Sequence, residues 1–156
     1  MKHLIFVGAL ALLVGCGKSG NYTDEKVAQQ VTCVNNLKQI GLGFRIWSGD
    51  HGDKNPFEVS TNAGGVMELA AAKDGLRQNG YLIFRCMSNE LTVPLLVVCP
   101  QDKSKAPAKD WANLTESNVS YIFPTTSNVL VVCPVDGNIL YTDGSVSEKI
   151  AGKHGP

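Results

Sequence analysis

The stretch from Asp24 to Ser48, DEKVAQQVTCVNNLKQIGLGFRIWS, decides the fold. Its apolar residues recur in steps of three and four, which is the spacing of one face of an amphipathic helix. These residues are Val27, Val31, Val34, Leu37, Ile40, Phe44 and Trp47. At 1.5 Å per residue the helix would be about 37 Å long. We interpret its apolar face as core, since Phe44 and Trp47 need a sheet to cover them.

Both ends of this helix are marked in the sequence. Thr23 is a candidate N-cap, and two acidic residues follow it in the first turn, where they favour the positive end of the helix dipole. The segment 48–56 contains Gly, Asn and Pro, which stop helices. Gly41 and Gly43 each weaken a helix by about 1 kcal/mol relative to Ala. They therefore predict a bend or a close contact with a neighbouring backbone.

Shorter elements are expected after the long helix. Residues 66–73 could form a short helix, and a second helix is predicted at 81–91. The later apolar runs predict strands at 95–99, 119–123, 129–133, 139–142 and 146–150. Asp136-Gly137 and Asp143-Gly144 separate such runs and are strong hairpin signals. One long helix followed by an antiparallel sheet is an α+β arrangement.

The N-terminal segment has the character of an export signal. Lys2 is followed by an apolar run from Leu4 to Val14, which is shorter than the about 20 residues that span a bilayer. The run ends in Leu-Val-Gly-Cys at residues 13–16, which resembles the lipobox of bacterial lipoproteins. The resemblance implies cleavage between Gly15 and Cys16 and acylation of Cys16. Stable attachment then requires more than one acyl chain.

This interpretation divides the chain into four parts. Residues 1–15 are the signal peptide, 16–22 are the lipidated cysteine and a tether, 23–150 form one domain, and 151–156 are a frayed tail. Residue 17 is Gly, whereas lipoproteins with an inner-membrane retention signal carry Asp there. We therefore expect a periplasm-facing protein anchored by lipid, in the outer membrane.

The charge balance excludes one class of partner. The chain has 14 basic and 14 acidic residues, and loss of Lys2 with the signal leaves it nearly neutral. Without a basic patch, nothing in the sequence points to nucleic acid. The membrane and envelope proteins are the partners that we expect.

Four cysteines remain once Cys16 is acylated, and an exported protein can pair them. Cys99 and Cys133 each close an apolar run and begin the same short pattern, Cys-Pro-x-Asp. If the two runs are neighbouring strands, Cys99–Cys133 is the disulfide to test first, which leaves Cys33–Cys86 as the second. The alternative is that all four are small buried hydrophobic residues. A thiol-redox protein is one of the alternative functions that the sequence allows.

Metal and catalytic chemistry find little support in the sequence. No Cys-x-x-Cys spacing occurs and histidine is scarce, so we predict no metal cofactor. A Ca²⁺ site is an alternative, with oxygen ligands from Asp136, Asn138 and Asp143. Hairpin turns explain the two aspartates without an ion. Because His51 lies in a Gly- and Asp-rich turn and is interpreted as a turn residue, we predict that the protein is not an enzyme.

Several segments resemble the prepilin-type pseudopilins, and more narrowly the type II secretion protein G-like group of planctomycete and verrucomicrobial bacteria. The resemblance extends over roughly residues 24–148. Its segments are CVNNLKQIGLGF at 33–44, Trp47, GDK at 52–54, Pro56, MSNEL at 87–91, VCPQDK at 98–103, NVSY at 118–121 and NILYTDGSV at 138–146. It implies a pilin-like head, in which one long helix packs against a small antiparallel sheet.

Two departures from this group affect the functional interpretation. The relatives begin with a prepilin leader and an apolar half-helix that builds a filament core, whereas here a lipobox takes that place. The His of the group's C-terminal His-x9-Asp-Gly segment falls on Cys133, so no role of that His is carried over. We expect a lipid-anchored envelope protein with a structural or accessory role in or beside a type II secretion or type IV pilus-like system. A lipid-anchored ligand- or Ca²⁺-binding module is the alternative.

Overall fold

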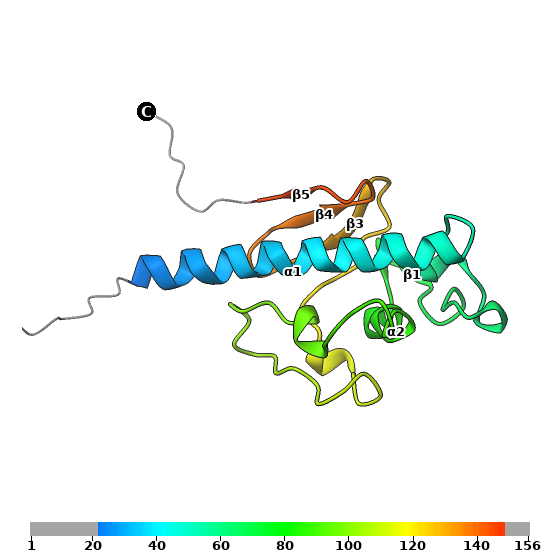
Figure 1. The fold of residues 1–156 in the computed structure, drawn as a ribbon, viewed down its shortest axis with the longest axis horizontal. Coiled ribbons are helices and arrows are strands. Elements are labelled where there is room, and N and C mark those ends of the chain that lie inside the picture. The colour runs from blue at the N-terminus through cyan, green and yellow to red at the C-terminus, as the bar shows by residue number, and fades with distance from the viewer. Residues whose placement is uncertain (1–21, 149–156) are drawn as a thin grey trace, which may run out of the picture.

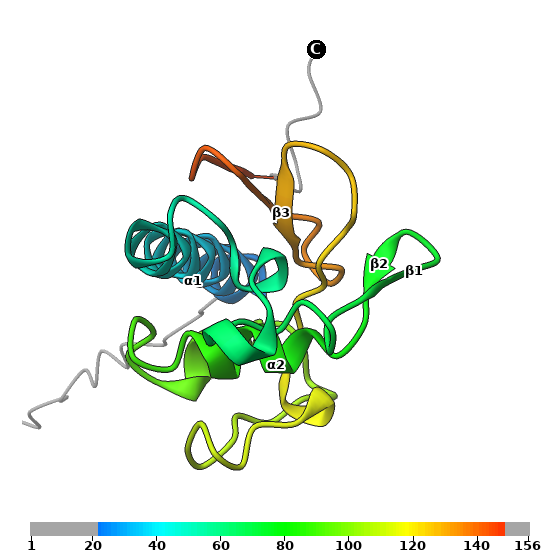
Figure 2. The ribbon, with the colours of Figure 1, turned by 90° about the vertical axis from the view of Figure 1, so that its right-hand side faces the viewer.

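Helix α1 (Tyr22–Asp50) runs along the molecule between two groups of shorter elements (Figure 1). On one side lies an antiparallel sheet of β3 (Val129–Val132), β4 (Ile139–Tyr141) and β5 (Val146–Ser147). On the other lie α2 (Gly80–Cys86) and the loops around it, as the view along α1 in Figure 2 shows. A separate hairpin joins β1 (Ala72–Lys73) to β2 (Leu76–Arg77). This computed structural model describes residues 22–148, and the predicted α+β class is confirmed.

The signal segment, the lipidation site Cys16 and the tail from 151 lie outside the described residues. Among the helices that are described, none is both long and apolar enough to cross a membrane.

The predicted long helix is confirmed, with ends two residues beyond those expected on each side. The helix ends at Asp50 because the backbone after it turns out of the helical conformation. Gly52 and Asp53 adopt left-handed conformations, with φ of 66° and 58°. This lets the N–H groups of His51 and Asp53 donate to the Ser48 carbonyl, at 3.0 and 2.9 Å. Carbonyl groups at the helix end are thereby satisfied, as helix ends require.

The apolar face of α1 is core over most of its length. Its buried residues are Cys33, Val34, Leu37, Ile40, Phe44 and Trp47. The sequence prediction was wrong for the first two positions of the face, because the side chains of Val27 and Val31 are 58% and 53% exposed. The buried face therefore starts at Cys33. At 100° per residue the buried residues span an arc of roughly 140° around α1, and Val27 and Val31 fall outside it.

Gly41 and Gly43 allow close packing against α1 without interrupting it. A Cβ at residue 41 would lie 2.9 Å from Leu140 Cδ1, and one at residue 43 would lie 2.7 Å from Leu91 Cδ2. The expected close contact is therefore present, but its partners are side chains rather than backbone. The helix continues through both glycines.

Gly43→Ala is expected to lower the free energy of unfolding by about 1–2 kcal/mol, because displacing buried Leu91 outweighs the gain in helix propensity. Gly49→Ala is the matched control on the same helix. Nothing lies within 4 Å of a Cβ at residue 49, so this variant should gain up to about 1 kcal/mol. Urea denaturation of both variants checks this, and a stabilised Gly43→Ala would contradict the packing argument.

Both predicted hairpins of the main sheet are present. Asp136-Gly137 joins β3 to β4, with Gly137 at φ 73° and its N–H donating to the Cys133 carbonyl at 2.8 Å. Asp143-Gly144 joins β4 to β5, with Gly144 at φ 85°. The glycines supply the positive φ that these turns need.

Two of the predicted strands are not strands in the structure. Residues 95–99 were predicted as one, but Pro94–Val97 is a 3-10 helix, η3. Pro94 provides the fixed φ suited to the first helical position, and burial of Leu96 and Val97 accounts for the apolar run. Residues 119–123 are extended but form an isolated β-bridge, Ile122 to Val132, instead of a continuous strand.

The expectations for residues 66–91 were right only in part. The helix predicted at 66–73 is absent, and turns lead into β1 there, with buried Val66 and Ala70 filling the core. Helix α2 begins one residue before the predicted start but ends at Cys86. The N–H of Met87 then bonds to Ile83 and Phe84 carbonyls, and turns replace the last part of the predicted helix.

An aromatic cluster joins the two sides of the molecule. The Phe123 ring lies 6.1 Å from Phe44 of α1 and 5.0 Å from Phe84 of α2, measured between ring centroids. All three side chains are buried. The extended segment 119–123 thus packs between α1 and α2 in one shared core.

Candidate functional site

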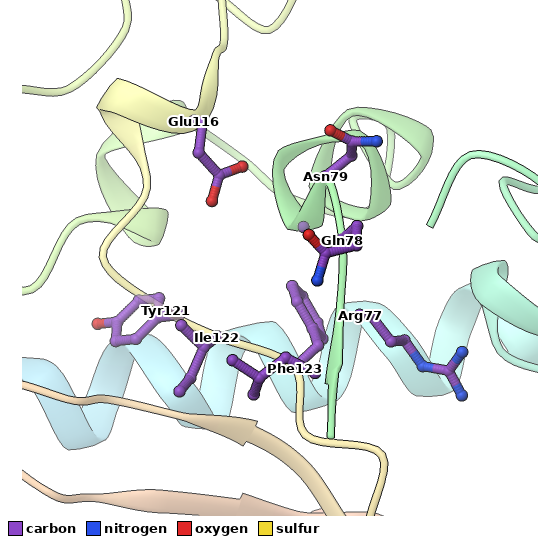
Figure 3. A pocket seen from close by; sticks show the side chains of 9 residues that line it. Arg77, Gln78, Asn79, Glu116, Tyr121, Ile122 and Phe123 are labelled. Carbon is purple, nitrogen blue, oxygen red and sulfur yellow. The ribbon is translucent and has the colours of Figure 1, made fainter. Parts of the chain in front are cut away.

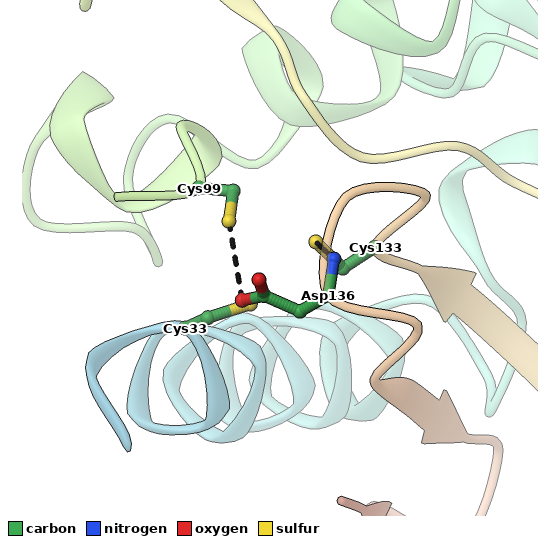
Figure 4. Close-up of side chains that lie close together, drawn as sticks. All are labelled: Cys33, Cys99, Cys133 and Asp136. Atoms are coloured by element: carbon green, nitrogen blue, oxygen red, sulfur yellow. Dashed lines mark hydrogen bonds between the residues drawn. The ribbon is translucent and has the colours of Figure 1, made fainter. Parts of the chain in front are cut away.

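Three cysteines and one aspartate converge beside α1, on the side where the β3–β4 turn and the end of η3 meet it (Figure 4). Cys33 comes from α1, and Cys99 follows η3 by two residues. Cys133 and Asp136 come from the β3–β4 turn. We call these four residues the thiol cluster.

The thiol cluster is compact, and its three cysteines are closed to solvent. Its three sulfurs and one carboxylate oxygen all lie within 4.8 Å of one another. The three cysteines are 0% exposed, and Asp136 is half-buried. The Cys99 thiol donates to Asp136 Oδ2 at 3.3 Å, while Asp136 Oδ1 is buried without a hydrogen-bond partner. A buried polar atom without a partner is uncommon and calls for an explanation.

The sulfurs are not electrostatically equivalent. The neighbouring Cys33 and Cys99 thiols, and then the backbone N–H of Asp136, lower the pKa of Cys133 because they donate to its thiolate. The same contact with Cys133 raises the pKa of Cys33 and of Cys99. Burial raises the pKa of Asp136 to about 6. The three sulfurs thus differ in the direction of the shift, and Cys133 is the one whose pKa is lowered.

Neighbouring polar groups hold the cysteines in position. The Tyr121 hydroxyl, on a side chain 2% exposed, donates to Cys33 Sγ at 3.7 Å. The backbone N–H of Cys99 donates to Ser120 Oγ at 3.0 Å, and that hydroxyl donates to Asp102 Oδ2 at 2.8 Å. The two Cys-Pro-x-Asp repeats thus serve one site differently. Asp136 joins the sulfurs, whereas Asp102 fixes the backbone of Cys99 through Ser120.

Ser120→Ala is expected to cost about 1–3 kcal/mol of stability, because the buried N–H of Cys99 loses its acceptor. Ser104→Ala is the matched control. Ser104 also donates to Asp102, at 2.6 Å, but is exposed, so its loss should cost about 0.5 kcal/mol or less. Chemical denaturation measures both. Equal effects of the two substitutions would show that the link to Cys99 is not what stabilises this region.

The structure treats the two proposed disulfides differently. Cys99 and Cys133 lie close together, with both thiols free, and the Cys33 thiol lies within the same 4.8 Å. The pairing Cys33–Cys86 does not fit. The Cys86 thiol donates to the Gly64 carbonyl at 3.1 Å and lies near Trp47, which is about 21 Å along α1 from Cys33. A disulfide needs Cα atoms about 4.4–6.8 Å apart.

The oxygen ligands of the alternative Ca²⁺ site do not form one site either. Asp136 precedes β4 and Asp143 follows it, so the two carboxylates lie at opposite ends of the strand. Asp143 accepts from the backbone N–H and hydroxyl of Ser145, and these bonds lower its pKa. Asn138 is fully buried beside the β3–β4 turn. The structure therefore brings Asn138 near Asp136 but leaves Asp143 apart.

His51 has a packing role in the structure. Its ring is stacked on Trp47 with centroids 3.6 Å apart and planes within 1°. Its Nδ1 lies 2.7 Å from the Trp47 carbonyl. These contacts place it against the last turn of α1, in agreement with its interpretation as a turn residue.

A surface pocket of about 300 Å³ lies between β2, α2 and η4 (Glu116–Asn118) (Figure 3). None of the residues that line it is a Cys, His, Ser, Thr or Lys. The Arg77 guanidinium is 3.8 Å from the centroid of the Phe57 ring, and Figure 3 shows it directed away from Glu116. The Tyr121 hydroxyl also leaves the pocket, toward Cys33. The chemically richest site of the described chain is therefore the thiol cluster.

The thiol cluster has no signature in the sequence, because its members come from three segments without Cys-x-x-Cys spacing. The repeated Cys-Pro-x-Asp pattern was the available signal, and it suggested only a disulfide.

No protein-family model matches the chain, and no curated protein or solved structure is significantly similar to it.

Proposed function

We propose that this protein is a lipid-anchored component of the cell envelope, with a pseudopilin-like head that has a structural or accessory role in or beside a type II secretion or type IV pilus-like apparatus. One observation carries the proposal. A 29-residue helix packs its later turns into a small antiparallel sheet and leaves its first turns outside the core. One long helix packed against a small antiparallel sheet is the arrangement that the pilin-like resemblance implies.

The short tether makes the anchor and the head a single unit. Residues 17–21 separate Cys16 from the start of α1. Even when fully extended, these residues span at most about 18 Å. Acylation of Cys16 would therefore hold the N-terminus of α1 close to the bilayer surface. The lipid would replace the apolar half-helix that anchors a pilin.

A second apolar row on α1 offers a surface for protein contacts. Val27, Val31, Leu42 and Ile46 are between 48% and 58% exposed. At 100° per residue they fall within an arc of roughly 100° on the helix. This row is distinct from the buried face. The residues form two exposed apolar pairs about 16 Å apart along the helix, with Asn35 and Lys38 on the same arc between them. We assign the two pairs to packing against a helix of another apparatus subunit.

The anchor is tested by mass spectrometry of the mature N-terminus in the native bacterium. The proposal expects Cys16 as the first residue, carrying two or three acyl chains. Cys16→Ser should lose the acyl mass and move the protein from the membrane to the soluble fraction. An unacylated mature terminus in the wild-type chain would overturn the anchor.

The contact surface is tested by photo-crosslinking in intact cells, with a crosslinking side chain at Val31 or Ile46. Adducts with identified secretion or pilus subunits are expected from both positions. Lys109, which is exposed on a loop away from α1, is the control position. Adducts that form equally from Lys109, or none from the helix, would argue against the apparatus role.

A further inference from the structure

We propose that Cys33, Cys99, Cys133 and Asp136 bind one Zn²⁺ ion. Four potential ligand atoms from three separate segments already lie within 4.8 Å of one another around a common point. Zn²⁺ in proteins is bound by Cys sulfur, His nitrogen and Asp or Glu oxygen, and a structural zinc site has four such ligands in tetrahedral arrangement. This inference does not depend on the lipid anchor or on the apparatus role.

The number and kind of the side chains favour a metal over a disulfide. A disulfide would use two of the three sulfurs and leave one thiol and one carboxylate buried beside it. A tetrahedral ion uses all four groups. It also accounts for Asp136 Oδ1, which is buried without a hydrogen-bond partner. The alternative that the cysteines serve only as small buried hydrophobic residues would not explain why a carboxylate enters a group of buried thiols.

The dimensions fit an ion after a small contraction. With metal–sulfur bonds of about 2.3 Å, ligands at tetrahedral corners are about 3.8 Å apart. The ligand atoms of the cluster, at no more than 4.8 Å, need to approach by about 1 Å at most. Rotation of side chains in a turn and at the end of η3 can provide that movement.

The β3–β4 turn presents two of the ligands together. Cys133 and Asp136 are three positions apart, and the Gly137 N–H donates to the Cys133 carbonyl at 2.8 Å to close the turn. The backbone N–H of Asp136 also donates to Cys133 Sγ at 3.4 Å. Hydrogen bonds of this kind orient ligands and adjust their basicity at metal sites. Tyr121 acts similarly on Cys33.

Ligand chemistry selects the ion. Thiolates are soft ligands that favour zinc, copper(I) and iron–sulfur clusters, whereas calcium and magnesium require oxygen. Three sulfurs with one carboxylate suit a single tetrahedral divalent ion, and we therefore assign Zn²⁺. On binding, the thiols become thiolates and release their protons to solvent. The ion would fix α1 to the β3–β4 turn and to the end of η3.

Metal binding is tested on the full chain carrying Cys16→Ser, which removes the one cysteine outside the described residues. The protein is purified under reducing conditions and stripped with a chelator. One Zn²⁺ per chain is expected by elemental analysis after reloading. Titration with Co²⁺ should give a thiolate-to-metal charge-transfer band and the intense visible bands of a tetrahedral site. Zn²⁺ should raise Tm by about 5 °C or more.

Three substitutions locate the site. Cys99→Ser and Asp136→Asn should each weaken Zn²⁺ binding by at least about 10- to 100-fold. Loss of a residue that only hydrogen-bonds to a metal ligand already weakens binding by that much, and loss of a ligand should cost more. Cys86→Ser is the matched control, because Cys86 is a half-buried cysteine outside the thiol cluster, and its thiol donates to the Gly64 carbonyl. It should bind as the parent does. Circular dichroism confirms folding, and the near-isosteric Asp136→Asn decides the question if Cys99→Ser does not fold.

A second readout separates the metal from a disulfide. In protein isolated without reductant, the chelator alone should make Cys33, Cys99 and Cys133 reactive toward an alkylating reagent. A Cys99–Cys133 disulfide would instead require a reductant, and this result would overturn the proposal. So would an absent charge-transfer band, or equal binding by the Asp136→Asn and parent proteins.

Discussion

Replacing Gly65 with alanine is expected to lower the free energy of unfolding by more than about 3 kcal/mol. Gly65 is buried, and a Cβ built on it would overlap the carbonyl group of Val59 and lie 2.6 Å from the Val59 side chain. The obstacle is backbone, so no rotamer change relieves it. Val59 is itself held, because its carbonyl accepts from the Met67 N–H at 3.0 Å. Movement of this loop would withdraw buried Val66 from the core.

Gly75→Ala is the control that separates this clash from ordinary loop strain. Gly75 has a φ of 78°, but nothing lies within 4 Å of a Cβ built there. Its substitution should cost only the about 1–2 kcal/mol of a left-handed backbone. Thermal and urea unfolding of both variants measure the difference. Equal losses at the two positions would mean that the Val59 contact does not limit residue 65.

The long helix could be predicted because its signal is local and repeated. Apolar residues at helical spacing from 27 to 47, with Gly and Pro beyond, leave few other structures open. The pattern did not show how much of the helix surface the rest of the chain buries. Val27 and Val31 continue the spacing of three and four, but at 100° per residue this spacing drifts away from the side of Leu37, and both are exposed. Burial depends on elements that arrive later in the chain.

The predictions for the apolar runs after residue 90 were less reliable because a short run has no distinctive period. Residues 95–99 and 129–133 share the ending Val-Val-Cys-Pro. One follows Pro94 and forms a 3-10 helix, and the other pairs with β4 and forms a strand. Pairing partners and a proline decide between the two outcomes.

The thiol cluster was beyond sequence reasoning for a related reason. Cys33 lies on a helix, and nothing near it in sequence indicates that its sulfur faces two others. Spacing rules detect metal ligands that one loop presents, whereas this cluster takes its ligands from three segments. Only the pair Cys133 and Asp136 is local. The prediction of no metal cofactor rested on spacing and stays untested until the metal content is measured.

Phe123→Ala is expected to lower the free energy of unfolding by about 3–5 kcal/mol. Its ring is 1% exposed and lies between Phe44 of α1 and Phe84 of α2. Truncation would leave a cavity where the two halves of the core meet. The ring also packs closely against Gly80, because a Cβ at residue 80 would lie 3.0 Å from it. Chemical denaturation with an unchanged m-value would report a loss of stability alone.

Phe57→Ala is the matched aromatic control for this position. Phe57 also approaches Phe44, at 6.4 Å between centroids, but it is only half-buried and carries Arg77 on its face. Its truncation removes less buried surface, so we expect a loss of about 1–2 kcal/mol. A larger loss for Phe57→Ala than for Phe123→Ala would contradict the view that segment 119–123 joins α1 to α2. We expect the larger effect from Phe123 because its ring is almost fully buried between Phe44 of α1 and Phe84 of α2, whereas Phe57 is half-buried.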